Sequence, residues 1–85
     1  MPERVYVQVR SVCDATGYML PRASIWPDGR VFTIEDVRSI RPDAASGGLR
    51  NCFTVMIRGQ ERTLFYEQYR NPPPCRHGRW YVEHS

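Results

Sequence analysis

The sequence predicts an all-β protein, and two observations support that prediction. Apolar and polar residues alternate with a period of two in several short runs, as at Val5, Val7 and Val9, which is typical of strands with one buried face. Turn-forming residues separate these runs at short intervals,. Because no segment shows convincing helical spacing, we expect a small antiparallel sheet without a helix.

The 85 residues allow one domain,. Hydrophobic residues make up 41% of the chain, which argues against a disordered protein,. No apolar run approaches the roughly 20 residues that span a bilayer, and the first ten residues lack the continuous apolar core of a signal peptide,. We therefore expect a cytoplasmic protein without a membrane partner.

All twelve basic residues are arginine, and the formal net charge is +3. Codon bias in a GC-rich genome explains the absence of lysine, although guanidinium groups also suit phosphate and aromatic partners. The three cysteines lack CxxC spacing and fit reduced thiols better than a disulfide framework. A cross-link between Cys13 and Cys52 stays open as the alternative.

The first strand is expected over the run that contains Val5 to Val9, and a turn follows at Asp14 to Gly17. The next run, 18–26, is a weaker strand candidate because Pro21 cannot donate a hydrogen bond to a neighbouring strand,. Simple alternation places Ala23 and Ile25 on its buried face and Trp26 on the opposite face.

The residues Trp-Pro-Asp-Gly-Arg at 26–30 predict a hairpin turn. Pro27 fixes its own φ near the value that a type I turn requires, and Gly29 can supply a positive φ. Such a turn, closed by a left-handed glycine, is a common hairpin connection. We expect Trp26 to cover the mouth of a barrel or to stack on Arg30 across the hairpin.

Beyond this hairpin, the two-residue alternation breaks. Ile34, Val37 and Ile40 lie three residues apart, a spacing that fits a bulge or a sharp bend, and less well one helical turn. A bulge would let one long strand serve two sides of a small barrel.

A loop is expected at 42–48. Two strands, at 53–57 and 63–66, are expected to form a tight hairpin about Gly59-Gln60. A proline-rich loop at 68–78 and a final strand at 80–82 complete the chain. The whole chain, 1–85, then forms a single domain. We predict a small five- to six-stranded antiparallel barrel or roll, Tudor-like or Src-homology-3-like, because closure removes the unpaired edges of a flat sheet.

The sequence offers little for catalysis. His77 and His84 lie in the proline-rich loop and beside the C-terminus, where a rigid scaffold would not hold them. Cys75 and His77 make one pair of close ligands, whereas structural zinc sites usually have two such pairs. We therefore expect no catalytic residue, no metal and no cofactor.

The core assigned by alternation leaves aromatic and arginine side chains on the outer face of the sheet. Aromatic rings interleaved with arginine are typical of surfaces that bind single-stranded nucleic acid. The alternative is that these rings form a second small core, or that a loop or another subunit covers them. The candidate binding face consists of Tyr6, Arg10, Arg22, Trp26, Arg30, Phe65 and Tyr81.

These features favour a non-catalytic binding module. We expect it to act through a protein partner or self-association, with nucleic-acid binding as the alternative, since nine acidic residues dilute the basic charge,.

Four motifs resemble those of a group of short uncharacterised bacterial proteins, which show W-x-DGR-x-[FY]-x-I, a G-x-x-x-x-LF[YE] hairpin and a closing GRW[FY]VE. The matching segments are 26–37, 53–59, 64–66 and 79–82, and the likeness runs from about Val5 to Glu83. This chain departs from the group at 68–77, where the last loop is longer. The resemblance implies a small β fold and a bacterial origin, and it transfers no site residue.

Overall fold

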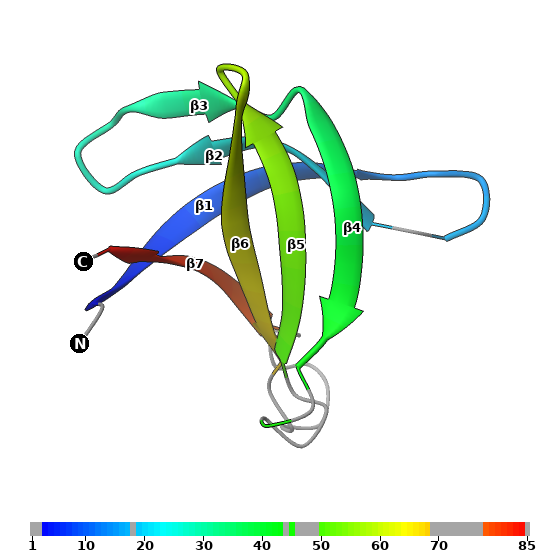
Figure 1. The fold of residues 1–85 in the computed structure, drawn as a ribbon. Helices are drawn as coiled ribbons and strands as arrows, with labels where there is room; N and C mark the ends of the chain where they lie inside the picture. The colour runs from blue at the N-terminus through cyan, green and yellow to red at the C-terminus, as the bar shows by residue number, and fades with distance from the viewer. Residues whose placement is uncertain (1–2, 18, 44, 46–49, 69–77, 85) are drawn as a thin grey trace.

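A computed structural model describes residues 3–17, 19–43, 45, 50–68 and 78–84. The fold is all-β, as predicted, with slightly more strands than expected, one of them only three residues long. Within these residues no helix is long and apolar enough to cross a membrane. The seven strands are β1 (Glu3–Cys13), β2 (Met19–Ile25), β3 (Val31–Thr33), β4 (Asp36–Pro42), β5 (Arg50–Ile57), β6 (Gln60–Gln68) and β7 (Gly78–His84) (Figure 1).

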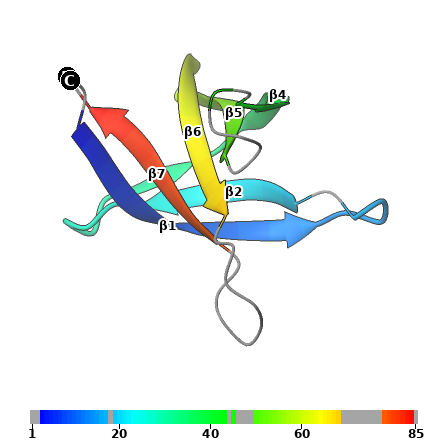
Figure 2. The same ribbon diagram turned by 90° about the horizontal axis from the view of Figure 1, so that it is seen from below.

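The strands form one antiparallel sheet in the order β3-β2-β1-β7-β6-β5-β4. The two edge strands, β3 and β4, are consecutive in the chain and are separated only by Ile34 and Glu35. The sheet must therefore curl until its edges approach each other. Its shape is a strongly curved half-barrel, as Figures 1 and 2 show from two directions.

Backbone hydrogen bonds hold this bend in place. The N–H of Ile34 donates to the carbonyl of Arg22 on β2, and the N–H of Glu35 donates to the carbonyl of Met56 on β5, both within 2.9 Å. Adjacent residues of the bend thus bond to opposite ends of the sheet.

Two bulges increase the curvature. On β2, Ala23 pairs with Arg10 and Pro21 pairs with Ser11, so Arg22 is an extra residue. On β4, Val37 and Ser39 pair with consecutive residues of β5, which leaves the residue between them unpaired. This second bulge, together with the bend before it, confirms the interpretation of the three-residue spacing, and no helical turn forms there.

The core lies on the concave side of the sheet. Val7, Ile34 and Val55 are 9%, 4% and 0% exposed, as the alternation predicts. Val5, Val9, Ile57 and several other half-buried residues pack against this core. The buried cluster consists of Val7, Ile34, Phe53, Val55, Leu64 and Trp80.

The predicted register of β2 is wrong. Ser24 pairs with Val9 and with Phe32, so it shares their concave face, and it is 2% exposed. Ala23 and Ile25 consequently face outward, because neighbouring residues of a strand lie on opposite faces. The bulge at Arg22 also places the buried Pro21 on the concave side.

The 26–30 turn forms as predicted. The N–H of Gly29 donates to the carbonyl of Trp26 at 2.9 Å, and Gly29 has a φ of 91°. The β5–β6 turn lies one residue earlier than expected, at Arg58-Gly59, with φ values of 53° and 73°. The predicted loops at 42–48 and 68–78 fall largely outside the described residues, although Gln68 ends β6 and Gly78 begins β7.

Gly78 has a packing role that predicts a stability effect. A Cβ atom at this position would lie 2.7 Å from the ring carbon Cζ of Tyr66 and would also clash with the carbonyl oxygen of Glu67. We expect Gly78→Ala to lower the free energy of unfolding by about 1–3 kcal/mol, as overpacking does. Urea denaturation followed by tryptophan fluorescence measures this change. Ser11→Ala, at an exposed strand position, is the control, and equal stability of both variants would contradict the packing argument.

Candidate functional site

Three of the predicted binding residues meet on the convex side of the sheet. Tyr6 and Phe65 both lie directly opposite Tyr81 in the strand register. The ring centroids of Tyr6 and Tyr81 are 5.5 Å apart, and those of Phe65 and Tyr81 are 5.0 Å apart with nearly parallel planes. We call these three residues the outer aromatic cluster.

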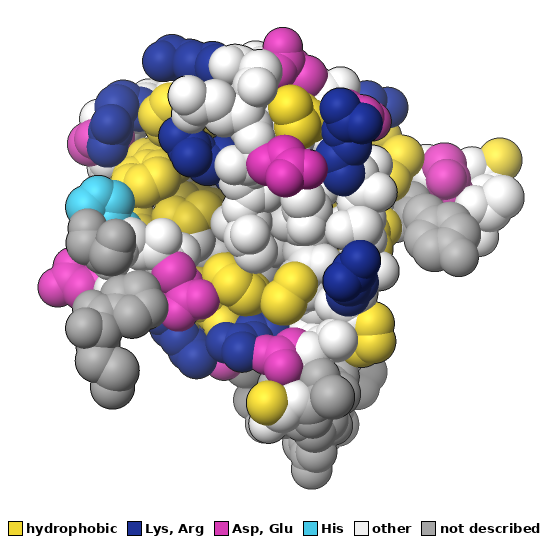
Figure 3. Space-filling view, viewed as in Figure 1, with side chains coloured by type: hydrophobic (Ala, Val, Ile, Leu, Met, Phe, Trp, Pro, Cys, Tyr) yellow, Lys and Arg dark blue, Asp and Glu magenta, His cyan; other side chains and the backbone are white. Residues whose placement is uncertain are grey.

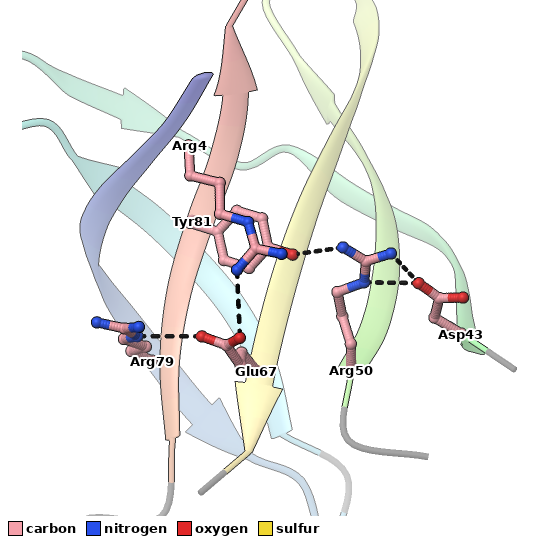
Figure 4. Close-up of polar contacts among 6 residues, drawn as sticks. All are labelled: Arg4, Asp43, Arg50, Glu67, Arg79 and Tyr81. Atoms are coloured by element: carbon pink, nitrogen blue, oxygen red, sulfur yellow. Dashed lines mark hydrogen bonds and ion pairs between the residues drawn. The ribbon is translucent and has the colours of Figure 1, made fainter. Parts of the chain in front are cut away.

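Arginine side chains cover this cluster. The guanidinium carbons of Arg4, Arg50 and Arg79 lie 4.6, 5.1 and 3.9 Å from the ring centroids of Tyr81, Phe65 and Tyr6, respectively. Glu67 forms ion pairs with Arg4 at 3.3 Å and with Arg79 at 3.1 Å (Figure 4). The positive charges that cover the rings are therefore partly neutralised within the cluster itself.

Arg50 connects the cluster to the edge of the sheet. Its Nη1 donates to the hydroxyl oxygen of Tyr81 at 2.7 Å, and its Nε donates to the Asp43 carboxylate at 2.6 Å (Figure 4). Hydrogen bonds from Arg50 hold the pKa of Asp43 below its usual value,. Tyr81 is 0% exposed and Phe65 is half-buried. The cluster thus corresponds to the second small core that the sequence left open.

Trp26 and Arg30 lie elsewhere, at the β2–β3 hairpin. Arg30 stacks on Trp26 at 5.0 Å, as predicted, and pairs with Asp28 at 2.6 Å. Trp26 itself is not part of the outer face. It lies two residues after Ser24, so its side chain is on the same concave side, and it packs against the core. Its ring meets Phe32 edge-on at 5.9 Å.

This hairpin borders an open groove. Strand β6 pairs with β7 only from Phe65–Tyr81 to Gln68–Gly78. Beyond Phe65–Tyr81 the two strands diverge, as both ribbon views show (Figures 1 and 2). Within the part of the chain that the structure describes, residues 60–64 of β6 then pair with β5 alone, and Val82–His84 of β7 pair with β1 alone. A groove of about 1110 Å³ opens between them.

The floor of the groove is apolar and continuous with the core. Figure 3 shows hydrophobic side chains in this hollow, with the histidine on its rim. The apolar side chains that line the concave side are those of Trp26, Phe32, Val55, Ile57, Leu64 and Val82, whereas the ring of Phe65 belongs to the outer aromatic cluster. Arg58 and Arg62 also line the groove, and the Arg58 guanidinium lies 5.2 Å from the Phe32 ring centroid.

The structure does not bring the seven predicted residues into one site. Arg10 and Arg22 are exposed and belong neither to the outer aromatic cluster nor to the groove lining. Sequence reasoning also missed Arg4 and Arg79, although each precedes a tyrosine of its own strand by two residues, a spacing that places both side chains on one face,. Arg58 and Arg62 carried no comparable signal.

Cys13, Cys52 and Tyr66 lie apart from the groove. Cys13 and Cys52 are free thiols, and burial raises the pKa of Cys52,. Burial likewise raises the pKa of Tyr66. Among the described residues, no three His, Cys, Asp or Glu side chains are grouped so that they could hold a metal ion, whereas Cys75 and His77 lie outside those residues.

Comparison of the chain with protein-family models, curated proteins and solved structures found no match. The resemblance to short bacterial proteins therefore stays a prediction.

The Asp43–Arg50 pair predicts a pH effect on stability. Because its pKa is lowered in the folded state, ionised Asp43 stabilises the fold above the unfolded pKa of about 4, and this contribution is lost as the pH falls through the folded value. We expect Asp43→Asn to be less stable than the wild type at pH 7. The difference should shrink as urea denaturation is repeated from about pH 4 down to pH 2. A difference that is constant with pH would contradict the assignment.

Proposed function

We propose that the chain is a small non-catalytic module of the bacterial cytoplasm that binds other protein chains, or a second copy of itself, through the groove between β6 and β7. The observation that carries this proposal is the early end of β6–β7 pairing at Phe65–Tyr81. It leaves two strand edges beside an apolar floor. Exposed apolar surfaces with polar rims commonly mark protein interaction sites.

The lining chemistry supports binding by shape and apolar contact. Trp26, Phe32 and Val82 present side chains that are only partly buried within the chain. Aromatic residues are enriched where protein partners gain most of their binding energy. A partner side chain between these residues would extend the existing core.

Nucleic-acid binding is the second candidate function. Arg58 and Arg62 beside Trp26 and Phe32 combine positive charge with aromatic rings, as single-strand binders do,. Arg30 already stacks on Trp26, however, and Arg58 lies over Phe32. Bases would have to displace these guanidinium groups before they could stack on the groove rings, which favours a protein partner.

The absence of catalysis and the cytoplasmic location are also part of the proposal. The only histidine among the described residues is His84, exposed at the end of β7. Ser24 in the groove lining is 2% exposed, which leaves its hydroxyl poorly placed to attack a substrate. The free thiols of Cys13 and Cys52 are compatible with a reducing compartment,.

Phe32 and its neighbour Val31 allow a matched test. Phe32 lines the groove, whereas Val31 faces the other side and is 54% exposed. Peptides selected from a random phage-displayed library on the wild-type domain are titrated by calorimetry against Phe32→Ala and Val31→Ala. We expect Phe32→Ala to weaken binding by about tenfold or more, and Val31→Ala to leave it nearly unchanged.

Three results would contradict the proposal. The first is that the library yields no groove-dependent peptide and light scattering shows no groove-dependent dimer. The second is equal binding by both variants. The third is tight binding of a labelled single strand, with affinity that falls steeply as salt rises, which would support the nucleic-acid candidate instead.

A further inference from the structure

The free edge of β6 has the form of a strand acceptor. Residues 60–64 are extended, and among the described residues they pair on one side only, with β5. Five residues of strand span roughly 16 Å, enough for a short peptide to pair along them. Their other edge faces the groove, where the diverging β7 leaves space. Peptides that add a strand to such an edge gain affinity from backbone hydrogen bonds and specificity from alternate side chains.

Positively and negatively charged side chains beside this edge lie on opposite faces of the sheet. Arg62 lies opposite the buried Val55 and therefore shares the concave face of the sheet. Glu61 lies opposite Met56, on the convex face. Glu83, on the far side of the groove, lies opposite Arg4 and is also convex. Both carboxylates in the groove lining thus point away from the concave side.

Two arginines remain available on the rim. Neither Arg58 nor Arg62 forms an ion pair within the part of the chain that the structure describes, and Arg62 instead donates to the side-chain oxygen of Gln60. Glu3 of β1 lies opposite His84 of β7 and does not line the groove, and the Glu35 carboxylate accepts the N–H of Gly59. Along residues 60–64, the charged side chain on the concave face is therefore that of Arg62.

Arg58 adds an independent observation. Its φ of 53° makes it the one non-glycine residue in the left-handed region among the described residues. Asparagine, aspartate or glycine is preferred at this turn position, and a bulkier residue there costs of order one to a few times the thermal energy. The strained conformation places the guanidinium beside Phe32, at the end of the groove.

We infer that the occupant of the groove is an extended acidic peptide of a partner protein, added as a strand to residues 60–64 of β6. Its backbone pairs with the free edge. Its apolar side chains contact the floor and its carboxylates lie beside Arg62 and Arg58, so both project from the face of the strand that is turned toward the concave side,. This inference rests on the proposed function and adds the conformation and charge of the bound segment.

The test uses four peptides with acetylated N-termini and amidated C-termini, and one pair of variants. The first peptide has glutamate and valine two residues apart, with threonine between them, so that both side chains project from one face of the strand. The second replaces glutamate by glutamine, and the third and fourth carry N-methyl groups on the two alternate sets of backbone amides of the first. They are titrated by calorimetry at low salt against the wild type, Arg62→Gln and the control Arg10→Gln, which replaces an exposed arginine outside the groove.

We expect the glutamate peptide to bind about tenfold more tightly than the glutamine peptide, as charge-assisted hydrogen bonds allow. Arg62→Gln should remove this advantage, and Arg10→Gln should retain it. Backbone amides within residues 60–64 should gain protection from hydrogen exchange, and N-methylation in the register that faces β6 should abolish binding. Circular dichroism of each variant verifies that the fold is retained.

The outcomes separate this inference from the proposed function. Equal binding of the glutamate and glutamine peptides would show that the bound peptide need not be acidic. The proposal that the groove binds a peptide would be unaffected. Unchanged binding of both N-methylated peptides would overturn strand addition. Neither unmodified peptide binds in a third outcome, while library-selected peptides still require Phe32. The inference of an extended acidic peptide would then be wrong, and the proposal of a peptide-binding groove would be retained. A groove-dependent dimer, or preference for a single-stranded DNA probe, would likewise overturn it.

Discussion

The structure depends on one bend, at Ile34 and Glu35, where the chain crosses from one edge of the sheet to the other. The N–H groups of these adjacent residues bond to Arg22 on β2 and to Met56 on β5. A seven-stranded sheet whose edge strands are two residues apart cannot be flat. The bend fixes the curl, and the curl encloses the six-residue core on the concave side. Ile34 contributes to both, since it makes a closing hydrogen bond and is 4% exposed.

The same constraint produces the groove. Strands β2 and β5 are drawn together at the bend, while β7 must also follow β1 along Val5–Val82 and Arg4–Glu83. β7 therefore leaves β6 after Phe65–Tyr81, and the sheet opens on that side. A small barrel removes its edges only by complete closure. A half-barrel keeps some unpaired strand edges. Among the described residues, the longest unpaired edge beside the apolar floor is that of β6.

The alternation of buried and exposed residues within a strand can be predicted from the sequence, whereas the pairing of distant strands cannot. Val7 and Val55 were correctly placed in the core because neighbouring residues on their strands alternate without interruption. Ala23 and Ile25 were misplaced because the bulge at Arg22 shifts the face of β2 by one residue, and nothing local distinguishes the two registers,. The seven predicted site residues scattered for a related reason. Alternation identifies the face of a strand, whereas only pairing between distant strands decides which rings an arginine covers.

Arginine serves two different purposes in this small domain. Around the outer aromatic cluster, Arg4, Arg50 and Arg79 lie over rings and are held by Glu67 or Asp43, so their charge is largely satisfied and their planar groups take the place of apolar packing. At the groove, Arg58 and Arg62 have neighbouring rings or amides and form no ion pair among the described residues. A guanidinium that is already paired gains little from another anion, whereas an unpaired one at a strand edge retains its full capacity for charge-assisted hydrogen bonds. The net charge of the chain therefore says less about the proposed partner than the position of Arg58 and Arg62 beside the free edge of β6, and that position supports our proposal of a carboxylate-bearing strand.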